Sequence, residues 1–419
     1  MYALVDANSF YASCEAVFDP SIRDKPIVVL TNNDGCICAL NKRAKALGIP
    51  KFAAYFKVKH LCQRHNVIVR SSNYELYADL SSKMMQILAR YACEQHIYSI
   101  DESFLQFKGY QNAIGDFTHH GRKIRRAIYR ETRLPVSVGI ASTPTLAKLA
   151  NHAAKTLPQF RGVCALESHR QVQDVLKQVA IEDVWGIGRK LSKRLRHQRI
   201  NSALDLANMP IKLAQHSFNI EVERTIRELN GEPCIHWDKI RQPKQQIYST
   251  RSFGQRISDI HHLGEALSQH AATVARKLRQ QHSLASRVML FAASSPYDKH
   301  PVHQKVLHQM TVPTNDTSVL LQVVKHALPK LFCPGVPFYK VGVGCLELID
   351  EQYNQGDLFQ PSKDNPALMQ CIDTINQRFG RDTVKHVAQG FQQPWTMKRQ
   401  YLSPSYTSRW TDLPQIKCH

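Results

Sequence analysis

The sequence predicts a multidomain protein of the α+β class. Its 419 residues are enough for about two to four domains. Two stretches, 1–165 and 249–350, alternate short apolar runs typical of strands with segments whose apolar residues recur at helical spacing, and 166–235 looks helical throughout. A hydrophobic content of 43% can fill several cores. Such a pattern indicates sheets covered by helices.

The composition favours a polyanionic partner. Lys and Arg number 55 against 34 Asp and Glu, a formal net charge of +21. A membrane partner is not expected, because no apolar run approaches the ~18 residues that span a bilayer and the N-terminus has no basic leader. The eleven cysteines form no Cys-x-x-Cys pair. They argue against a zinc site or a disulfide framework and for a reducing, cytoplasmic location.

The first part of the chain predicts an antiparallel sheet with helices on one face. Its expected elements are a buried strand at 2–6, a helix at 10–15, a strand at 27–30, a turn at 32–35, a short basic helix at 39–47, an amphipathic helix at 75–94, a hairpin at 97–107, a basic helix at 120–132, a strand at 136–140 and a helix at 143–155. Asp6 stands at the end of the first strand, where functional side chains often lie.

The hairpin at 97–107 carries the adjacent carboxylates Asp101 and Glu102 at its tip. Taken alone, such a pair is most simply a solvated acidic turn. Adjacent carboxylates on a rigid support repel each other, however, and they are best tolerated beside a cation, as in a two-metal site. Asp6 supplies another carboxylate elsewhere in the chain, so the sequence favours a metal site at this hairpin.

The helical stretch at 166–235 places Gly186 and Gly188 at the start of a helix, followed by Arg189 and Lys190. This is the pattern of a helix–hairpin–helix turn, in which glycines let backbone N–H groups approach a phosphate. A plain turn is the alternative interpretation. The net charge of the chain favours binding to the DNA backbone.

Residues 236–248 are polar and basic and indicate a linker, after which 249–350 predict a second, smaller α+β domain. Its expected elements are a basic strand at 249–256 containing Arg251 and Arg256, helices at 263–281 and 316–331, and strands at 288–291 and 340–346. From about 351 the sequence turns irregular. The last stretch, 397–419, is rich in Pro, Ser, Thr and aromatic residues and is typical of a docking tail.

Several motifs occur in one order along the chain, and together they resemble the Y-family translesion DNA polymerases. They are Asp6 with Phe10-Tyr11, the Ser-Ile-Asp-Glu-Ser hairpin at 99–103, Lys45, Lys155 and the Gly186/Gly188 turn. The stretches at 32–36, 251–254 and 401–410 are similar to the UmuC-type catalytic subunits of that family. The resemblance covers nearly the whole chain.

The resemblance implies a right-hand polymerase fold. It assigns a ferredoxin-like palm to 1–18 and 76–165, small fingers to 19–75, a helical thumb with the helix–hairpin–helix to 166–235, an α+β little finger to 249–350 and a C-terminal docking tail to 351–419. The implied activity is error-prone translesion synthesis in an SOS-type response. It transfers a nucleotide from a dNTP to the primer 3′-hydroxyl of primer–template DNA opposite damage.

By the same resemblance, Asp6, Asp101 and Glu102 are the catalytic metal carboxylates, and the Ala7 carbonyl is a further ligand. The implied cofactor is a pair of Mg²⁺ ions. Two ions ~3.5–4 Å apart need carboxylates that bridge them. Mg²⁺ prefers oxygen ligands and keeps several waters, so few protein groups suffice.

The resemblance also implies nucleotide contacts. Lys45 and Lys155 match positions that grip the β- and γ-phosphates. Lys148 is a weaker candidate for this role. Tyr11 matches the steric gate, an aromatic ring that excludes a ribose 2′-hydroxyl, and Phe10 would support it, although two core aromatics on a helix are the alternative.

Two further positions are compared with the family. Position 42 is Lys where many relatives carry a phosphate-binding Tyr, so that contact is replaced by charge or lost. Cys36 and Cys38 align with small residues that roof the templating base, and small side chains there leave room for damaged bases. A Cys-x-Cys metal site is the weaker interpretation, because the usual partner ligands are missing.

The tail of the chain implies partners. Gln355-Gly356-Asp357-Leu358-Phe359 resembles a sliding-clamp-binding peptide in which Gln355, Leu358 and Phe359 make the contacts, although Gly356 departs from the usual Leu. Relatives of the UmuC type work with a UmuD′-like dimer and a RecA filament. The tail from about 360 is the expected surface for them, and the active protein would be nucleoid-associated.

Two other functions stay open at this point. A two-metal nuclease also needs clustered carboxylates and Mg²⁺, and a noncatalytic DNA-binding scaffold would need only the charge and the tail. Lys45, Lys155 and Tyr11 make sense only with a nucleoside triphosphate, which favours the polymerase.

Overall fold

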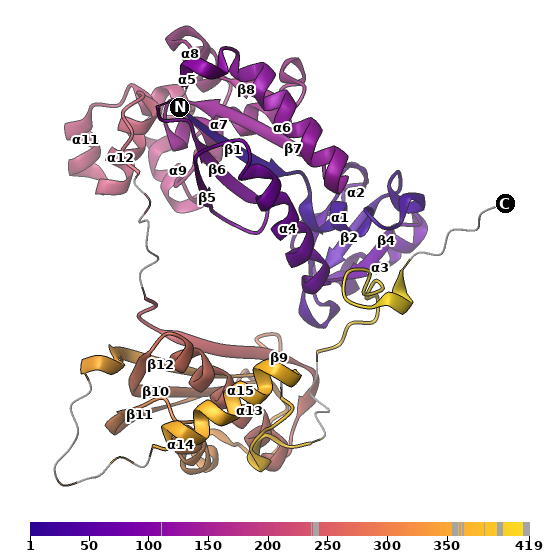
Figure 1. The fold of residues 1–419 in the computed structure, drawn as a ribbon, viewed down its shortest axis with the longest axis vertical. Coiled ribbons are helices and arrows are strands. Elements are labelled where there is room, and N and C mark those ends of the chain that lie inside the picture. The colour runs from indigo at the N-terminus through magenta and orange to yellow at the C-terminus, as the bar shows by residue number, and fades with distance from the viewer. Residues whose placement is uncertain are drawn as a thin grey trace. The chain divides into compact units, whose positions relative to one another are not determined.

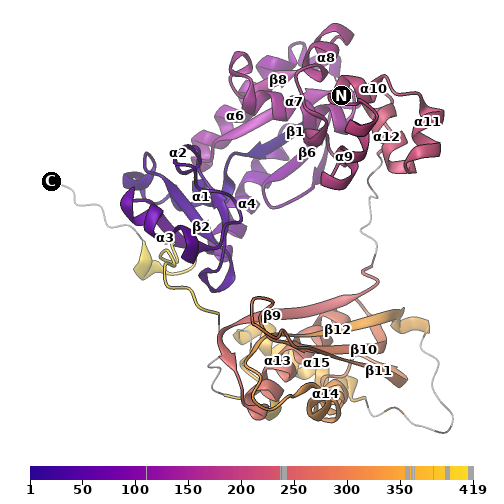
Figure 2. The same cartoon turned by 180° about the vertical axis from the view of Figure 1, so that it is seen from behind.

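The computed structural model describes residues 1–109, 111–235, 237, 243–353, 359, 362, 364–380, 382–391 and 397–413. The chain forms two compact units (Figures 1 and 2). Unit 1 comprises Met1–Lys239 with Gln400–His419, and unit 2 comprises Ile240–Arg399. Each contains helices packed on sheets, which confirms the α+β class. Among the described residues, no helix has the length and apolar character needed to cross a membrane.

Unit 1 is built on a five-stranded sheet in the order β5-β6-β1-β7-β8. The strands are β1 (Tyr2–Ala7), β5 (Glu94–Ile97), β6 (Glu102–Gln106), β7 (Val136–Ala141) and β8 (Val163–Ala165). The central strand β1 pairs antiparallel with both β6 and β7, whereas β7 and β8 run parallel. The predicted strand at 2–6 and the hairpin therefore become direct neighbours.

Helices cover both faces of this sheet, so the prediction of helices on one face was wrong. Ala3 and Val5 pack with α4 (Tyr74–Leu88) and α6 (Phe117–Thr132), while Leu4 packs with α7 (Pro144–Thr156) on the opposite face. A strand that is apolar on both sides must be covered on both sides. A short helix, α5 (Gln111–Ile114), precedes α6.

A second sheet of three strands, in the order β3-β2-β4, forms beside α1 (Phe10–Glu15). Its strands are β2 (Ile27–Leu30), β3 (Ile37–Leu40) and β4 (Ile68–Ser71), accompanied by α2 (Lys42–Ala46) and α3 (Tyr55–Arg64). The helix predicted at 39–47 begins only at Lys42, because Ala39 and Leu40 pair with β2 and Asn41 caps the helix by accepting from Ala44 N at 2.9 Å.

In the rest of unit 1, one predicted helix is shorter than expected, and the predicted helical region is confirmed. The helix expected at 75–94 ends at Leu88, because Glu94 already pairs with Gln106 in the sheet. The helical prediction for 166–235 is confirmed by five helices: α8 (His169–Leu176), α9 (Arg189–His197), α10 (Ala203–Ala207), α11 (Ile211–Ser217) and α12 (Ile220–Leu229). They share a core with α7.

Unit 2 contains an antiparallel sheet in the order β11-β10-β12-β9. The strands are β9 (Ile247–Ile257), β10 (Ser283–Ala293), β11 (His303–Thr314) and β12 (Phe338–Asp350), and α13 (Ile260–Gln280) and α14 (Thr317–Leu331) pack on one face. The edge strand β11 was not predicted, because its polar, largely exposed residues carry a weak apolar signal.

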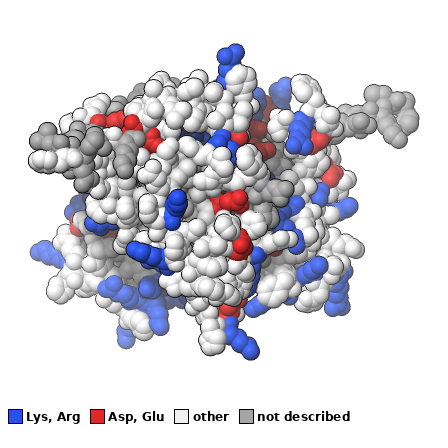
Figure 3. Space-filling view, turned by 90° about the horizontal axis from the view of Figure 1, so that it is seen from below, with Lys and Arg blue, Asp and Glu red and all other residues white. Residues whose placement is uncertain are grey.

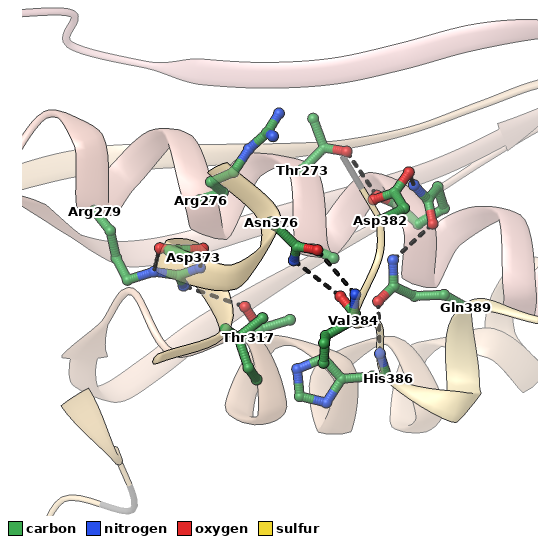
Figure 4. A pocket seen from close by; sticks show the side chains of 13 residues that line it. Thr273, Arg276, Arg279, Thr317, Asp373, Asn376, Asp382, Val384, His386 and Gln389 are labelled. Atoms are coloured by element: carbon green, nitrogen blue, oxygen red, sulfur yellow. Dashed lines mark hydrogen bonds and ion pairs between the residues drawn. The ribbon is translucent and has the colours of Figure 1, made fainter. Parts of the chain in front are cut away.

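The prediction of an irregular chain beyond 351 was wrong for Pro366–Phe379, which form α15. Asn365 caps this helix by accepting from Leu368 N. Figure 4 shows how α15 is fastened to α13: the Arg279 guanidinium binds both carboxylate oxygens of Asp373 at 2.7 and 2.9 Å. The pocket there holds only about 40 Å³, so this contact is structural.

Candidate active site

Strand pairing brings the three predicted carboxylates to one end of the β1–β6 pair. Asp6 lies directly opposite Glu102 in the antiparallel register. Asp101 precedes β6, and its carbonyl accepts a hydrogen bond from Ala7 N at 2.9 Å. Residues far apart in the sequence therefore meet because the register of two neighbouring strands places them there.

The turn that carries Asp101 is fixed by Ser99. Its hydroxyl donates to Asp101 Oδ1 at 2.6 Å and accepts from the backbone N–H groups of Asp101 and Glu102 at 3.3 and 3.1 Å. The N–H groups of Tyr98 and Ser99 both donate to the Glu102 carbonyl. The acidic hairpin is thus a rigid support, as its sequence predicts.

Two lysines of α7 neutralise two of these carboxylates. Lys155 Nζ lies 2.6 Å from Asp6 Oδ2, and Lys148 Nζ lies 3.1 and 3.2 Å from the two oxygens of Glu102. Burial raises the pKa of Asp6 to about 6; Lys155 opposes the shift and Glu102 adds to it. Lys148 also lies over the Tyr98 ring, 4.6 Å from its centroid.

The carboxylates are held by these partners rather than by one another. Within the described ranges, no three Asp, Glu, His or Cys side chains are grouped as a preformed metal cluster. Asp6 and Glu102 are paired with lysines, and Asp101 accepts from Ser99. A cation at this site would compete with the two ammonium groups for the same oxygens.

A cavity of about 570 Å³ opens beside the acidic end of β1, a volume within the range of small-molecule sites. Many of the residues that the sequence analysis identified line this cavity. Its lining comprises Asp6, Ala7, Ser9, Phe10, Tyr11, Cys38, Ala39, Leu40, Lys45, Ile49, Pro50, Lys51, Ile100 and Asp101. Carboxylates, an aromatic pair and two lysines therefore share one cavity.

Tyr11 is held firmly in this cavity. Its ring stacks on Tyr77 of α4, with centroids 4.5 Å apart and planes at 14°, and contacts the edge of Tyr74 at 6.0 Å. Burial raises the pKa of Tyr11 to about 12. Phe10 is only 4% exposed and belongs to the core, so packing accounts for it better than it does for Tyr11.

The two cysteines of the predicted roof differ. Cys38 lies on β3, lines the cavity and donates from Sγ to the Val29 carbonyl at 3.3 Å. Cys36 is half-buried, its backbone N–H donates to Thr31 Oγ1, and it does not line the cavity. Of these two cysteines, only Cys38 therefore lines the candidate nucleotide site.

A second, basic cavity of about 530 Å³ adjoins the first, and Ser9 lines both. Lys42, Lys155, Arg125 and Arg161 contribute its positive charge. Of these, the sequence pointed only to the two lysines. Arg125 and Arg161 were missed because they stand on separate elements without a motif, and Lys51 of the first cavity was missed for the same reason.

The segment predicted to be a helix–hairpin–helix turn has a positive φ at one of its two glycines. Gly186 has φ +87°, a conformation that other residues rarely adopt, and Gly188 is the N-cap of α9 with no side-chain cap. Arg189 and Lys190 follow at the first helical positions and are exposed. The N-terminus of α9 thus presents backbone N–H groups with two cations beside them.

In unit 2, the predicted basic residues lie on the edge strand β9. Arg251 and Arg256 are exposed, and Arg256 forms an ion pair with Asp298 at 2.8 Å. Lys and Arg side chains visibly outnumber Asp and Glu on the face of the molecule drawn in Figure 3, in keeping with the net charge of +21. In the clamp motif, Gln355 and Leu358 lie outside the described residues, and Phe359 is 93% exposed.

Comparison with known proteins matches nearly the whole chain. Residues 5–152 match the impB/mucB/samB family, 244–358 match that family's C-terminal domain, and 366–416 match a domain of unknown function, DUF4113. Protein UmuC of Salmonella typhimurium is 40% identical over 423 residues, covering 100% of both chains. Protein SamB of Salmonella typhimurium is 38% identical with the same coverage, and DNA polymerase IV of Bacillus velezensis is 27% identical over 91% of each chain.

Solved structures agree in fold. A Dbh–Dpo4 chimera, described as a Y-family DNA polymerase, gives a TM-score of 0.63 at 19% identity and covers 83% of this chain and 99% of its own. An insertion ternary complex of Dbh DNA polymerase gives a TM-score of 0.52 at 20% identity, with the same coverage.

The chain has the fold of solved structures that are described as Y-family DNA polymerases, and it is a DNA-directed DNA polymerase. Within that class, the chain belongs to the impB/mucB/samB family. It is an error-prone translesion polymerase of SOS mutagenesis and DNA repair, as the resemblance implied.

Proposed function

We propose that Asp6, Asp101 and Glu102, with the Ala7 carbonyl, hold two Mg²⁺ ions for nucleotidyl transfer. The donor set fits a hard dication, since every group offers oxygen. The raised pKa of Asp6, with Glu102 directly opposite, supports a site that gains from added positive charge. Bound here, the ions would activate the primer 3′-hydroxyl and offset the charge of the triphosphate.

Lys45 and Lys155 bind the β- and γ-phosphates in this proposal. Lys45 lines the cavity that contains Tyr11 and Asp101, and Lys155 lines the adjoining basic cavity while pairing with Asp6. Lysine ammonium groups act as point charges for phosphate. Lys155 therefore has two alternative partners, the carboxylate of Asp6 and the triphosphate. Lys148 is assigned to Glu102 instead, because its ammonium group donates to both carboxylate oxygens of Glu102.

In this proposal, Tyr11 serves as the steric gate, and Cys38 and Cys36 are assigned to the roof of the templating base, although only Cys38 lines the cavity. The support for the gate is the stacking of Tyr11 on Tyr77, which keeps the ring in one place within the cavity. A ring fixed by packing can discriminate against one added hydroxyl more sharply than a mobile one.

DNA is held by backbone contacts from both units. In unit 1 we assign Gly186, Gly188, Arg189 and Lys190 to phosphate binding at the N-terminus of α9, where the exposed cations and the uncapped N–H groups support it. In unit 2 we assign Arg251 and Arg256 on β9. Such contacts position a duplex without reading its sequence, as a polymerase requires.

The partners are a sliding clamp, a UmuD′-like dimer and a RecA filament, acting at the nucleoid. UmuC among the relatives supports the UmuD-type partner. Large apolar side chains beyond residue 360 stay exposed and offer contact area, among them Phe379 at 65%, Phe391 at 76% and Trp410 at 90%. Phe359 with Gln355 and Leu358 forms the clamp motif.

The single observation that carries the proposal is the alignment of Asp6 with Glu102 beside a cavity containing Tyr11 and Lys45. A two-metal nuclease would need the carboxylates but not a cavity of about 570 Å³ with a fixed aromatic ring and a lysine. Degradation of labelled DNA without nucleotides would favour the nuclease.

The test is primer extension by the full-length Asp101→Ala variant. We expect extension to fall by at least about a thousandfold, because the metal site loses a ligand, while DNA binding is retained. Asp174→Ala is the matched control, since Asp174 is an exposed aspartate of α8. Normal extension by Asp101→Ala would refute the metal assignment. Extension past an abasic site, with and without UmuD′ and RecA, tests the partners.

A further inference from the structure

The residues that follow unit 2 in the sequence, from Gln400 on, belong to unit 1. Residues 400–412 are named here the C-terminal strap. The Ser71 N–H donates to the Tyr401 carbonyl at 3.0 Å, and the Tyr401 N–H donates to Ser71 Oγ at 3.0 Å. The Gln400 N–H donates to Asp34 Oδ2 at 2.8 Å. The two bonds with Ser71 attach the strap to β4, an edge strand of the three-stranded sheet, and the bond to Asp34 attaches it to the turn at 32–35.

Aromatic contacts hold the strap along its length. Tyr406 stacks on Phe18, with centroids 5.0 Å apart and planes at 17°, and Tyr401 contacts the edge of Tyr55 at 5.8 Å. Chain ends are ordinarily poorly ordered unless something fastens them. The strap is therefore a packed part of unit 1.

Ser403 is the most deeply placed residue of the strap, with 4% exposure. Its hydroxyl accepts a hydrogen bond from Asn73 Nδ2 at 3.0 Å. Asn73 is equally buried and caps α4, because its Oδ1 accepts from the Leu76 N–H at 3.3 Å. One asparagine thus joins the strap to the first turn of α4.

A second connection runs through Glu15, a buried carboxylate at the end of α1. The Tyr77 hydroxyl donates to Glu15 Oε1 at 2.6 Å, and Arg70 lies 3.6 Å from Oε2. Burial raises the pKa of Glu15, whereas the neighbouring Tyr77, Ser403 and Arg70 oppose the shift. Ser403 of the strap therefore lies near a carboxylate that is buried between α1 and α4.

Both connections end at the same place. Tyr77 and Tyr74 of α4 both contact the ring of Tyr11. The position of the Tyr11 ring depends on the first turns of α4, and this turn is bonded to Ser403 through Asn73. No residue of the strap needs to touch the nucleotide for this dependence to hold.

We propose that the C-terminal strap sets the sugar selectivity of the polymerase, with Ser403 as a positioning residue that holds α4, and through it the Tyr11 gate, in place. This inference rests on the proposed role of Tyr11 and assigns a role to the latter part of the segment matched by DUF4113. Loosening the strap lets the Tyr11 ring shift and admits ribonucleotides.

The experiment measures the ratio of kcat/KM for a dNTP to that for the matching ribonucleotide in the full-length protein. Ser403→Ala is expected to lower this ratio about threefold to tenfold, the effect of one lost buried hydrogen bond, with kcat for the dNTP changed less than twofold. Ser408→Ala is the matched control, since Ser408 is an exposed serine of the same strap, and its ratio stays unchanged.

Hydrogen exchange of amides at the start of α4 gives a readout independent of catalysis. The double variant Tyr401→Ala/Tyr406→Ala, which removes both aromatic anchors, is expected to lose protection there while β7 stays protected. Unchanged protection in a folded variant would overturn the proposal even if synthesis were lost.

A double-variant cycle separates this inference from the gate assignment. If Ser403 acts through Tyr11, Ser403→Ala has no further effect on selectivity in a Tyr11→Ala background. If Tyr11→Ala leaves selectivity unchanged, the gate assignment fails and the inference falls with it. If Tyr11→Ala relaxes selectivity but Ser403→Ala matches Ser408→Ala, only the inference is overturned.

Discussion

Lys155 Nζ and Asp6 Oδ2 lie 2.6 Å apart, an ion pair that joins α7 to β1. The lysine is our candidate for triphosphate binding and the aspartate our candidate metal ligand. Because Lys155 and a metal ion would compete for the same Asp6 oxygens, we expect metal binding to Asp6 to be coupled to release of Lys155 toward phosphate. The pair thus links the two halves of the proposed substrate complex.

Lys155→Ala tests this coupling. We expect the KM for a dNTP to rise about tenfold, the loss of one charge-assisted contact, while the half-saturating Mg²⁺ concentration stays the same or falls because Asp6 loses a competing cation. Steady-state extension at varied dNTP and Mg²⁺ measures both. Lys177→Ala, an exposed lysine of unit 1, is the control. A raised Mg²⁺ requirement with an unchanged KM would contradict the coupling.

Gly139→Ala tests how closely α7 packs on β7. A Cβ atom at this position would lie 2.0 Å from Asn151 N and 2.3 Å from the Ala147 carbonyl oxygen, both backbone atoms. We expect destabilisation of unit 1 by at least about 3 kcal/mol, the upper range for overpacking, measured by urea unfolding. Gly35→Ala is the control, because its nearest contact would be an ordinary 3.5 Å.

The stability of unit 2 should depend on pH through His270. Burial, with Arg251 and Lys277 nearby, lowers the pKa of His270 to about 4, and its Nδ1 is hydrogen-bonded to Ser249 Oγ at 2.8 Å. As the pH falls, the unfolded chain binds the proton first. The contribution of neutral His270 to the free energy of unfolding is therefore full above about pH 6.5 and is lost as the pH falls toward 4, by about 2 kcal/mol at pH 5.

His270→Gln should therefore flatten this pH dependence. Thermal unfolding at pH 7 and pH 5 measures it, with His300→Gln, an exposed histidine, as the control. An equal loss of stability in both variants between the two pH values would show that other groups are responsible.

Arg189→Ala and Lys190→Ala test the helix–hairpin–helix. Each should weaken binding to duplex DNA of any sequence and reduce the salt slope of log affinity by about 1, the effect of one lost phosphate contact. Titration of labelled primer–template at several salt concentrations measures both. A slope equal to that of the Lys177→Ala control would place these side chains away from DNA.

Much of the fold could be read from local patterns. Apolar spacing predicted β1, β2, β7 and the helices of 166–235 because each pattern lies within a few residues. The prediction was wrong where contacts with distant residues decide the structure. Ala39 stands next to a sequence with helical spacing, but it pairs with β2. The edge strand β11 is defined by its pairing with β10 and not by its own residues.

The candidate site divides in the same way. Asp101 and Glu102 adjoin in the sequence, Asp6 ends a predicted strand, and the resemblance supplied Lys45, Lys155 and Tyr11. The sequence could not show that Lys148 pairs with Glu102, that Arg125 and Arg161 border the basic cavity, or that Cys36 stands outside the nucleotide-sized cavity. Those facts depend on how α7, α6 and β3 pack.

The sequence by itself determined the class of protein, through motifs that occur in one order along the chain. It also determined the acidic hairpin and the glycine turn, since each of these depends on residues close together in the chain. Tertiary structure alone decided that Asp6 lies opposite Glu102, that Lys155 forms an ion pair with Asp6, and that Ser403 is hydrogen-bonded to Asn73. Such contacts join residues distant in sequence. They are set by strand register and packing, for which no local preference carries information.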